Sequence, residues 1–426
     1  MTPAPMLSGP LCALVAGLLI LAPLAIAGLA LVNAGLGRSR STAQSLVGSL
    51  AIFSIAIVVF TGIGCIFAGS SSAVGVHAGG KFWDILGLGP WILRGFAAMP
   101  PETQLRLLFE CLAAALAGLI PWGAGADRLR LAAGMAAAAV TSAFLFPLLA
   151  HWTWGGGWLG ALGANFGLGA GFLDNAGAAS VHTLGGLSAL AVVWIAGPRK
   201  GKFPREGLAT AMPAHQGAFV LFGCLLALVG WLAWNAAGSI LWLHAEPGAI
   251  AGTALNTLLC AASSLIATFA VTRIRFGKPD ASLCANGWMA GLVSSSACAA
   301  LVTPGQALFI GAVAGVFTPL LVEVLELALS IDDPTGAITV HGAGGLWGLF
   351  AAGLFAPGAG QFLAQLAGIA TLLGLFLPLV YAIAALLNRF VAFRVDPDGE
   401  RLGMDLHELG GGAYPEFVIH RDDSYR

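Results

Sequence analysis

Long apolar runs alternate with short polar connections along the whole chain. Eleven such runs with few charges fall at 8–32, 46–69, 105–123, 132–150, 176–197, 214–236, 249–272, 282–302, 306–328, 336–357 and 364–388. An α-helix needs about 20 apolar residues to cross a bilayer, and most of these runs are that long. The pattern predicts an all-α polytopic membrane protein with eleven transmembrane helices. The first run has no Lys or Arg before it, which favours a retained span over a cleaved signal.

The basic residues are divided unevenly between the two sides of the predicted membrane. Three of the nineteen Lys and Arg residues, Lys81, Arg94 and Arg106, lie on one side. The other sixteen lie opposite: Arg38, Arg40, Arg128, Arg130, Arg199, Lys200, Lys202, Arg205, Arg273, Arg275, Lys278, Arg389, Arg394, Arg401, Arg421 and Arg426. The positive-inside rule makes that side cytoplasmic, with the N-terminus outside and the C-terminus inside. We expect a multi-pass protein of the cell inner (plasma) membrane, surrounded by lipid.

Composition narrows the function classes. The chain is 58% hydrophobic and 9% charged, with a mean hydropathy of +0.88 and a net charge of −1. This balance excludes a soluble globular domain and offers no basic surface for nucleic acid. The seven cysteines form no Cys-x-x-Cys pair and are interpreted as buried thiols, and no metal cluster, cofactor motif or nucleophile set emerges. We predict no enzyme, metal or cofactor. Residues 1–390 form the membrane domain and 391–426 a cytoplasmic tail.

Two segments of the chain repeat one another. DNAGAASVHTLGG, from Asp174, and DPTGAITVHGAGG, from Asp333, share seven of thirteen residues. His182 lies in the fifth span and His341 in the tenth, so the second copy enters the membrane from the opposite face. The chain therefore contains inverted five-helix repeats, at about 8–197 and 214–357, followed by a final span at 364–388. Such repeats place related residues around a pseudo-twofold axis near the bilayer midplane. We expect His182 and His341 to face one another.

A histidine at membrane depth is costly unless it is neutral and hydrogen-bonded. Paired imidazoles satisfy this requirement, because one ring can donate a hydrogen bond and the other accept it. Such a pair would line a narrow path for a small polar molecule, whereas a cation would need more ligands to replace its water. The alternative is that the two rings only tie two helices together.

Several motifs carry a family resemblance. They are AHWTWGGGWLGALG (150–163), DNAGAASVH (174–182), GWLAWNAAGS (230–239), ANGWMAGLV (285–293), IDDPTGAITVHGAGGLWG (331–348) and GMDLHELGGGAY (403–414). Together they resemble the ammonium transporter family, Amt/Mep/Rh, and Amt more than Rh. The resemblance implies a homotrimer with one pore in each protomer. Ammonium would be recruited at an outer aromatic vestibule and deprotonated, and ammonia would pass twin histidines. These histidines match His182 and His341.

The resemblance also assigns the outer vestibule. Trp154 matches the tryptophan whose ring face would hold the cation. Asp174 matches the aspartate at the outer start of the fifth span, where it would cap the helix; an added role in ammonium recruitment stays open. Trp234 replaces a gate phenylalanine, and Ala113 stands where the other is expected. The usual serine of the cation site falls at Gly238, or is Ser239 if the helix carries one extra residue.

Further departures concern the mouth and the tail. Glu110 stands where glutamine is usual: facing the pore it would attract ammonium, and facing a helix contact it would pair with a hydroxyl or amide. The outer loop 155–175 carries about eight inserted residues, by comparison with the family pattern, and the loop 70–104 contains an aromatic stretch expected at the membrane interface. The family's tail couples protomers and meets the regulatory protein PII. Here coupling between protomers and PII control are both open.

We predict transport of ammonium or ammonia. The rival is an ammonium sensor with little conduction, signalling through a separate partner, because the altered gate and longer outer loop also suit a pocket that binds without passing its ligand. A neutral-gas channel for carbon dioxide is a third alternative.

Overall fold

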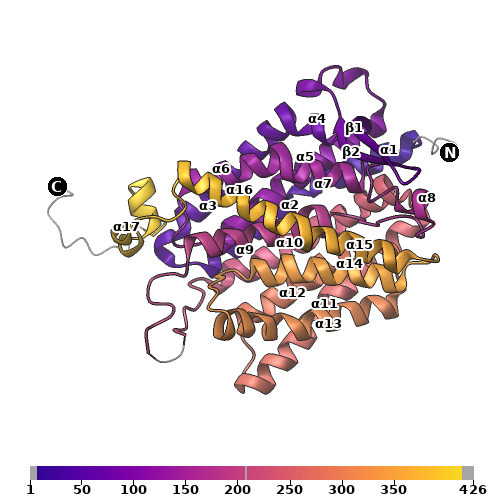
Figure 1. The fold of residues 1–426 in the computed structure, drawn as a ribbon. Helices are drawn as coiled ribbons and strands as arrows, with labels where there is room; N and C mark the ends of the chain where they lie inside the picture. Colours follow the sequence, from indigo (N-terminus) through magenta and orange to yellow (C-terminus); the bar gives the residue numbers. More distant parts are fainter. Residues whose placement is uncertain (1–6, 207–208, 415–426) are drawn as a thin grey trace.

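The computed structural model describes residues 7–206 and 209–414, so Arg421 and Arg426 of the cytoplasmic charge set lie outside the described residues. Long helices run side by side through one bundle (Figure 1). Ten helical segments in these ranges are long and apolar enough to cross a membrane, as the hydrophobic runs predict. They comprise α1 (Gly9–Leu21) with α2 (Pro23–Leu36), α3 (Thr42–Val59) with α4 (Cys65–Phe67), α5 (Pro101–Ala124), α6 (Leu131–Val140) with α7 (Phe146–Thr153), α9 (Leu184–Ala196), α10 (Gly217–Leu243), α11 (Ile250–Phe276), α13 (Pro304–Glu323), α14 (Gly344–Phe355), and α15 (Gln361–Thr371) with α16 (Leu377–Phe390).

The eleventh predicted span is α12 (Ala281–Cys298). It is less apolar than the others because it carries Asn286 and three consecutive serines, Ser294 to Ser296, all of which are buried. It packs against α10, α11, α13 and α14. A helix enclosed by protein need not be as apolar as one that faces lipid, so α12 completes the predicted set of eleven.

The same helix pairings occur in both halves of the chain. In the first half α5 packs on α9 and α3 packs on α6; in the second half the corresponding pairs are α12 on α14 and α11 on α13. The leading helices of the two halves, α2 and α10, pack on each other. This repetition of contacts agrees with the five-helix repeats predicted from the two histidine motifs. The final span, α15 with α16, packs on α14 and α9 outside that pattern.

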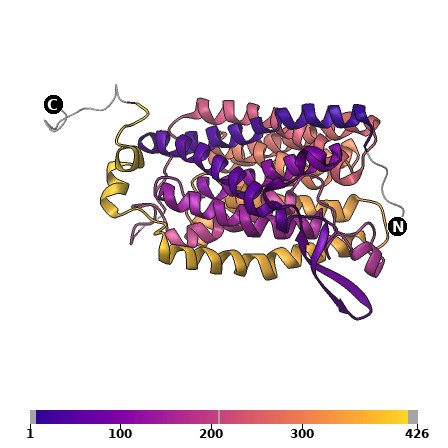
Figure 2. The same ribbon diagram turned by 90° about the horizontal axis from the view of Figure 1, so that it is seen from above.

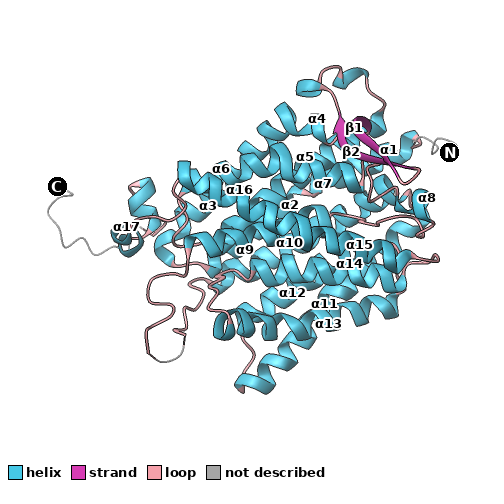
Figure 3. Ribbon diagram, in the orientation of Figure 1, coloured by secondary structure: helices cyan, strands magenta, loops and turns pink. Residues whose placement is uncertain are grey.

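The structure adds an element that the sequence interpretation missed. Strands β1 (Ser71–Ala78) and β2 (Lys81–Leu88) form an antiparallel hairpin, the only sheet within residues 7–206 and 209–414 (Figure 3). The hairpin projects from one end of the bundle (Figure 2). Its base is held by Trp152, whose indole Nε1 donates to the carbonyl oxygen of Ile85 at 2.7 Å. Aromatic and apolar residues suit both a strand and a membrane interface, so the sequence alone did not separate the two. The inserted outer loop contains a short helix, α8 (Leu162–Phe166).

The tail folds back onto the opposite end of the bundle, where α17 (Pro397–Leu402) lies (Figure 1). The carboxylate of Asp405 accepts hydrogen bonds from the backbone N–H groups of Ala43 and Gln44, at 3.1 and 2.7 Å. Glu408 accepts one from the N–H of Leu131 at 2.9 Å. These N–H groups belong to the first turns of α3 and α6, where no carbonyl of the same helix is available to them. The tail thus supplies the caps of two membrane helices.

Candidate functional site

Two buried histidines meet in the middle of the bundle. The Nδ1 atoms of His182 and His341 are 3.3 Å apart, and their ring centroids are 5.3 Å apart. Both side chains are almost fully buried, and the ring of His182 also stacks on Trp231 at 5.3 Å. A hydrogen bond between two Nδ1 atoms requires one ring to carry its proton there and the other to carry it on Nε2. Two neutral rings in different tautomers satisfy this geometry.

Glycines allow the helices that carry these rings to cross closely. A side chain at Gly186 would place its Cβ 2.2 Å from the backbone nitrogen of Gly342, and one at Gly345 would lie 2.5 Å from Oγ1 of Thr183. Both histidines lie in π-helical turns, Ala178–Thr183 and Ile338–Ala343, that lead into α9 and α14. Small residues bring backbones together in membrane bundles, and here they bring the two rings into contact.

Asp174 organises the turn before His182. One carboxylate oxygen accepts from the N–H of Gly177 at 2.9 Å; the other accepts from the N–H groups of Ala179 and Ser180 and from the Ser180 hydroxyl, at 3.0 to 3.2 Å. Burial raises the pKa of Asp174 to about 6, although the Ser180 hydrogen bonds oppose the shift. The helix-capping interpretation therefore accounts for every short contact of this carboxylate. Its pseudo-equivalent, Asp333, caps the N–H of Ile338 at 2.7 Å.

An aromatic cluster lies beside Asp174. Trp154 donates its indole N–H to the carbonyl oxygen of Asp174 at 2.7 Å, and Trp234 donates to that of Ala176 at 2.7 Å. Phe109 joins the two tryptophans: its ring centroid is 4.4 Å from that of Trp234 and 5.6 Å from that of Trp154. Sequence reasoning placed Ala113 at the missing half of the gate and overlooked Phe109, which lies one helical turn earlier on α5. Phe109 supplies aromatic packing in this cluster.

A second tryptophan covers Trp154. The rings of Trp154 and Trp242 are parallel within 6° and their centroids are 4.9 Å apart. Trp242, near the end of α10, was not identified from the sequence. The signal was a third tryptophan in WLAWNAAGSILW, at a spacing that places it two turns beyond Trp234.

A pocket of about 320 Å³ opens on this aromatic stack. Its lining includes Trp154, Trp242, Arg106 and Glu110, together with the loop residues that lead into and out of the hairpin. Glu110 therefore lines this pocket, next to the aromatic stack. Of the remaining predicted residues, Ala113 is fully buried in α5, and the hydroxyl of Ser239 donates to the carbonyl oxygen of Ala236 on its own helix.

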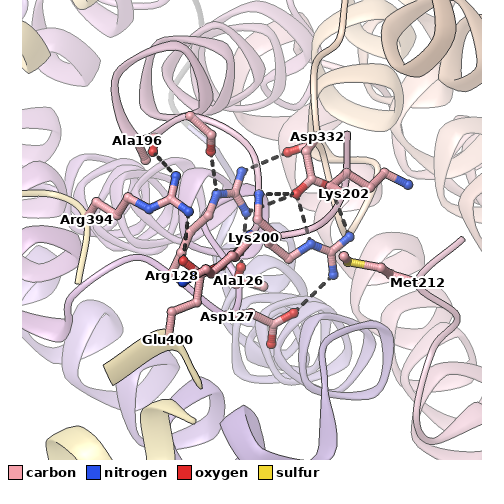
Figure 4. A network of polar contacts seen from close by, with 12 residues as sticks. Ala126, Asp127, Arg128, Ala196, Lys200, Lys202, Met212, Asp332, Arg394 and Glu400 are labelled. Carbon is pink, nitrogen blue, oxygen red and sulfur yellow. Dashed lines mark hydrogen bonds and ion pairs between the residues drawn. The ribbon is translucent and has the colours of Figure 1, made fainter. Parts of the chain in front are cut away.

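A network of buried ion pairs lies at the opposite end of the bundle (Figure 4). Arg199 donates to Asp332 at 2.9 Å and to Asp127 at 3.0 Å, and Arg128 donates to the carbonyl oxygen of Asp332 at 2.8 Å. Burial alone would raise the pKa of Asp332, but the hydrogen bond and charge of Arg199 outweigh it and lower the pKa. Arg394 of the tail pairs with Glu400 at 2.7 Å and donates to the carbonyl oxygen of Ala196, at the end of α9, at 2.7 Å. These contacts fix the loop between α5 and α6, the loop after α9 and the segment that leads towards α14.

The family model described as Ammonium Transporter Family matches residues 12–414. The chain belongs to the ammonium transporter family. Relatives include ammonium transporter Amt2 of Archaeoglobus fulgidus, 35% identical over 413 residues, covering 92% of this chain and 85% of that one. Amt2 of Haloferax mediterranei is 31% identical over 408 residues, covering 92% of this chain and 87% of that one.

Solved structures agree in fold. A sensor Amt protein superposes with a TM-score of 0.84 and 26% identity, covering 93% of this chain and 97% of that one. Mep2 of Candida albicans superposes with a TM-score of 0.74 and 24% identity, covering 97% of this chain and 92% of that one, which shows a shared fold. Family membership and the apolar helices together make the chain a multi-pass membrane protein of an ammonium transporter family.

Proposed function

We propose that this protein carries ammonium to the membrane interior, removes its proton, and passes ammonia along a path lined by His182 and His341. The contact between the two buried imidazoles is the observation that supports this proposal most directly. Two neutral rings offer donor and acceptor positions to a small polar molecule without placing a fixed charge at membrane depth.

Deprotonation follows from the cost of burying charge. A cation at the bilayer centre costs about 2.5 to 3.5 kcal/mol even on insertion scales, whereas a neutral ammonia molecule does not pay that cost. The histidine contact offers a cation no ring of carboxylates or carbonyl oxygens to replace its water. On this proposal potassium is rejected because it cannot lose a proton.

Recruitment is assigned to the outer aromatic cluster. Trp154 supplies a ring face at the pocket, worth about 0.5 to 2 kcal/mol to a cation, depending on desolvation. Trp234 supplies a second ring face only when the cluster that buries it moves. Asp174 positions the Trp154 indole through its carbonyl oxygen, and its carboxylate adds negative charge nearby. Ser239 lies on α10 with Trp234, and Ala113 lies on α5 with Phe109. We also propose that the protein forms a homotrimer in the plasma membrane, with the vestibule and the N-terminus outside. The tail would couple the protomers or bind PII.

A sensor is the second candidate, and the packing of the aromatic cluster favours it. Trp234 is 1% exposed, its indole N–H is bonded to Ala176, and Phe109 covers its ring. Unless this aromatic cluster moves, its packing would keep a ligand in the outer pocket and away from the histidines. The resemblance to a sensor Amt protein supports the same interpretation.

The two candidates differ in one measurement. Purified protein in proteoliposomes on a solid-supported membrane should give a transient current on an ammonium pulse, and a matched pH-dye assay should show ammonia entry. Ammonium binding with neither current nor ammonia flux would reject transport and favour the sensor.

A further inference from the structure

Three charged residues lie on one face of α5 where it borders the outer pocket. Glu102, Arg106 and Glu110 are spaced four residues apart, so their side chains leave the helix on the same side. Arg106 and Glu110 line the pocket together with Trp154 and Trp242. The three side chains differ in their ion-pair and hydrogen-bond partners.

Arg106 is already paired. Its guanidinium lies 2.8 Å from a carboxylate oxygen of Glu102 and 5.1 Å from the ring centroid of Trp242. Trp242 in turn stacks on Trp154. One face of this tryptophan pair therefore carries a cation that belongs to the protein, and Arg106 has its own carboxylate partner.

Glu110 has no such partner. Its residue is 6% exposed, yet among the described residues it forms no hydrogen bond or ion pair. Asp174, a carboxylate of similar burial, accepts four hydrogen bonds. A buried carboxylate is expensive unless it is paired and hydrogen-bonded. Arg106, the one Lys or Arg in the described pocket lining, makes no bond to Glu110, although its Nε has no other hydrogen-bond partner.

We propose that Glu110 is the anionic ligand of the transported or sensed cation in the outer pocket. This inference rests on the proposed function for the identity of that cation, ammonium, and it names the residue that selects it. Ammonium offers four N–H donors to the carboxylate and fits easily within about 320 Å³ together with water. Recruitment here is by charge as well as by ring faces, since Arg106 occupies part of the aromatic stack.

Glutamine is the decisive replacement, because it keeps the shape of Glu110 and removes its charge. Full-length protein in detergent is titrated with ammonium chloride against choline chloride at constant ionic strength, by calorimetry, at pH 7. We expect Glu110→Gln to weaken ammonium binding at least about ten-fold, as loss of a hydrogen bond to a charged group does. Glu246→Gln, at an exposed position of the outer loop before α11, is the matched control and should bind as wild type.

Wild-type affinity in Glu110→Gln would overturn the proposal and assign Glu110 as a neutral, structural acid. Thermal unfolding of each variant shows whether it folds; if Glu110→Gln does not, Glu110→Asp is measured, which keeps the charge but shortens its reach and is expected to bind ammonium more weakly than wild type. Equal affinity in Glu110→Asp would also overturn the proposal. The binding assay is independent of conduction: absence of current in wild type rejects transport, whereas the effect of Glu110→Gln on binding tests only the ligand.

Discussion

Nδ1 of His182 lies 3.3 Å from Nδ1 of His341, although 159 positions separate the two residues in the chain. Only one of these nitrogens can donate the shared proton, so the two rings hold different tautomers despite their related positions. The repeat is therefore symmetric in backbone and asymmetric in hydrogen bonding.

Removing either imidazole should disturb conduction. His182→Ala or His341→Ala leaves the other ring buried without its partner, a cost of about 1 to 3 kcal/mol, and removes one polar edge of the path. We expect ammonia flux to fall about ten-fold or selectivity over potassium to weaken, measured in proteoliposomes. Monodisperse elution and an unfolding transition serve as the folding control. Wild-type flux and selectivity in both variants would contradict the pore assignment.

The close crossing at Gly186 should tolerate no side chain. A Cβ there would lie 2.2 Å from the backbone nitrogen of Gly342, so Gly186→Ala forces α9 away from the π-helical turn Ile338–Ala343 that leads into α14. We expect a loss of about 1 to 3 kcal/mol in stability, seen as a lower midpoint of thermal unfolding in detergent. Gly374→Ala is the control, because a Cβ at Gly374 has no neighbour within 4 Å. Equal midpoints for both variants would show that the crossing can relax.

Asp174 should make stability depend on pH in the acidic range. Its pKa in the folded protein is about 6, above its value in an unfolded chain, so the folded state binds a proton more tightly. The contribution of this group to stability is greatest below about pH 4 and decreases as the pH rises to about 6. Asp174→Asn should remove that dependence and lower the unfolding midpoint through weaker capping. A midpoint that responds identically to pH in both proteins would reject this assignment.

Asp332 should act in the opposite direction. Its lowered pKa means that its contribution to stability is present above about pH 4 and is lost as the pH falls further. At pH 7, Asp332→Asn leaves Arg199 and Arg128 buried without this carboxylate, and breaking such a pair costs about 3 to 5 kcal/mol. Asp398→Asn, in an exposed pair with Arg401, should change stability by less than about 1 kcal/mol. Thermal unfolding measures the stability of Asp332→Asn and Asp398→Asn. Similar losses of stability in the two variants would exclude a special role for the buried network.

The helices and the histidine contact were predictable from the sequence, for a physical reason. Membrane depth restricts a span to a long apolar run, and polar residues within such runs are few, so His182 and His341 were conspicuous. The repeat then related them by symmetry. Asp174 caps the following turn, as its position before the fifth apolar run indicated, and Asp333 caps the turn at the corresponding place in the second repeat.

The vestibule was harder to predict because side chains from distant helices build it. Phe109 on α5 and Trp242 on α10 become neighbours only when those helices pack, and periodicity within one helix does not report that contact. Glu110 could be assigned to either of two environments from its helix position, and its place in the pocket lining emerges only when the helices pack. The hairpin was missed because its residues also suit a membrane interface.

The hydrogen bonds from Asp405 and Glu408 to the starts of α3 and α6 have a consequence for how the protein comes apart. Composition divides the chain near residue 390, but those bonds cross the division. Melting of the last segment uncovers amide groups of helices that begin more than 270 residues earlier in the chain. Residues 405–408 and the starts of α3 and α6 consequently belong to one cooperative unit, and hydrogen exchange at Ala43, Gln44 and Leu131 would report the departure of the tail.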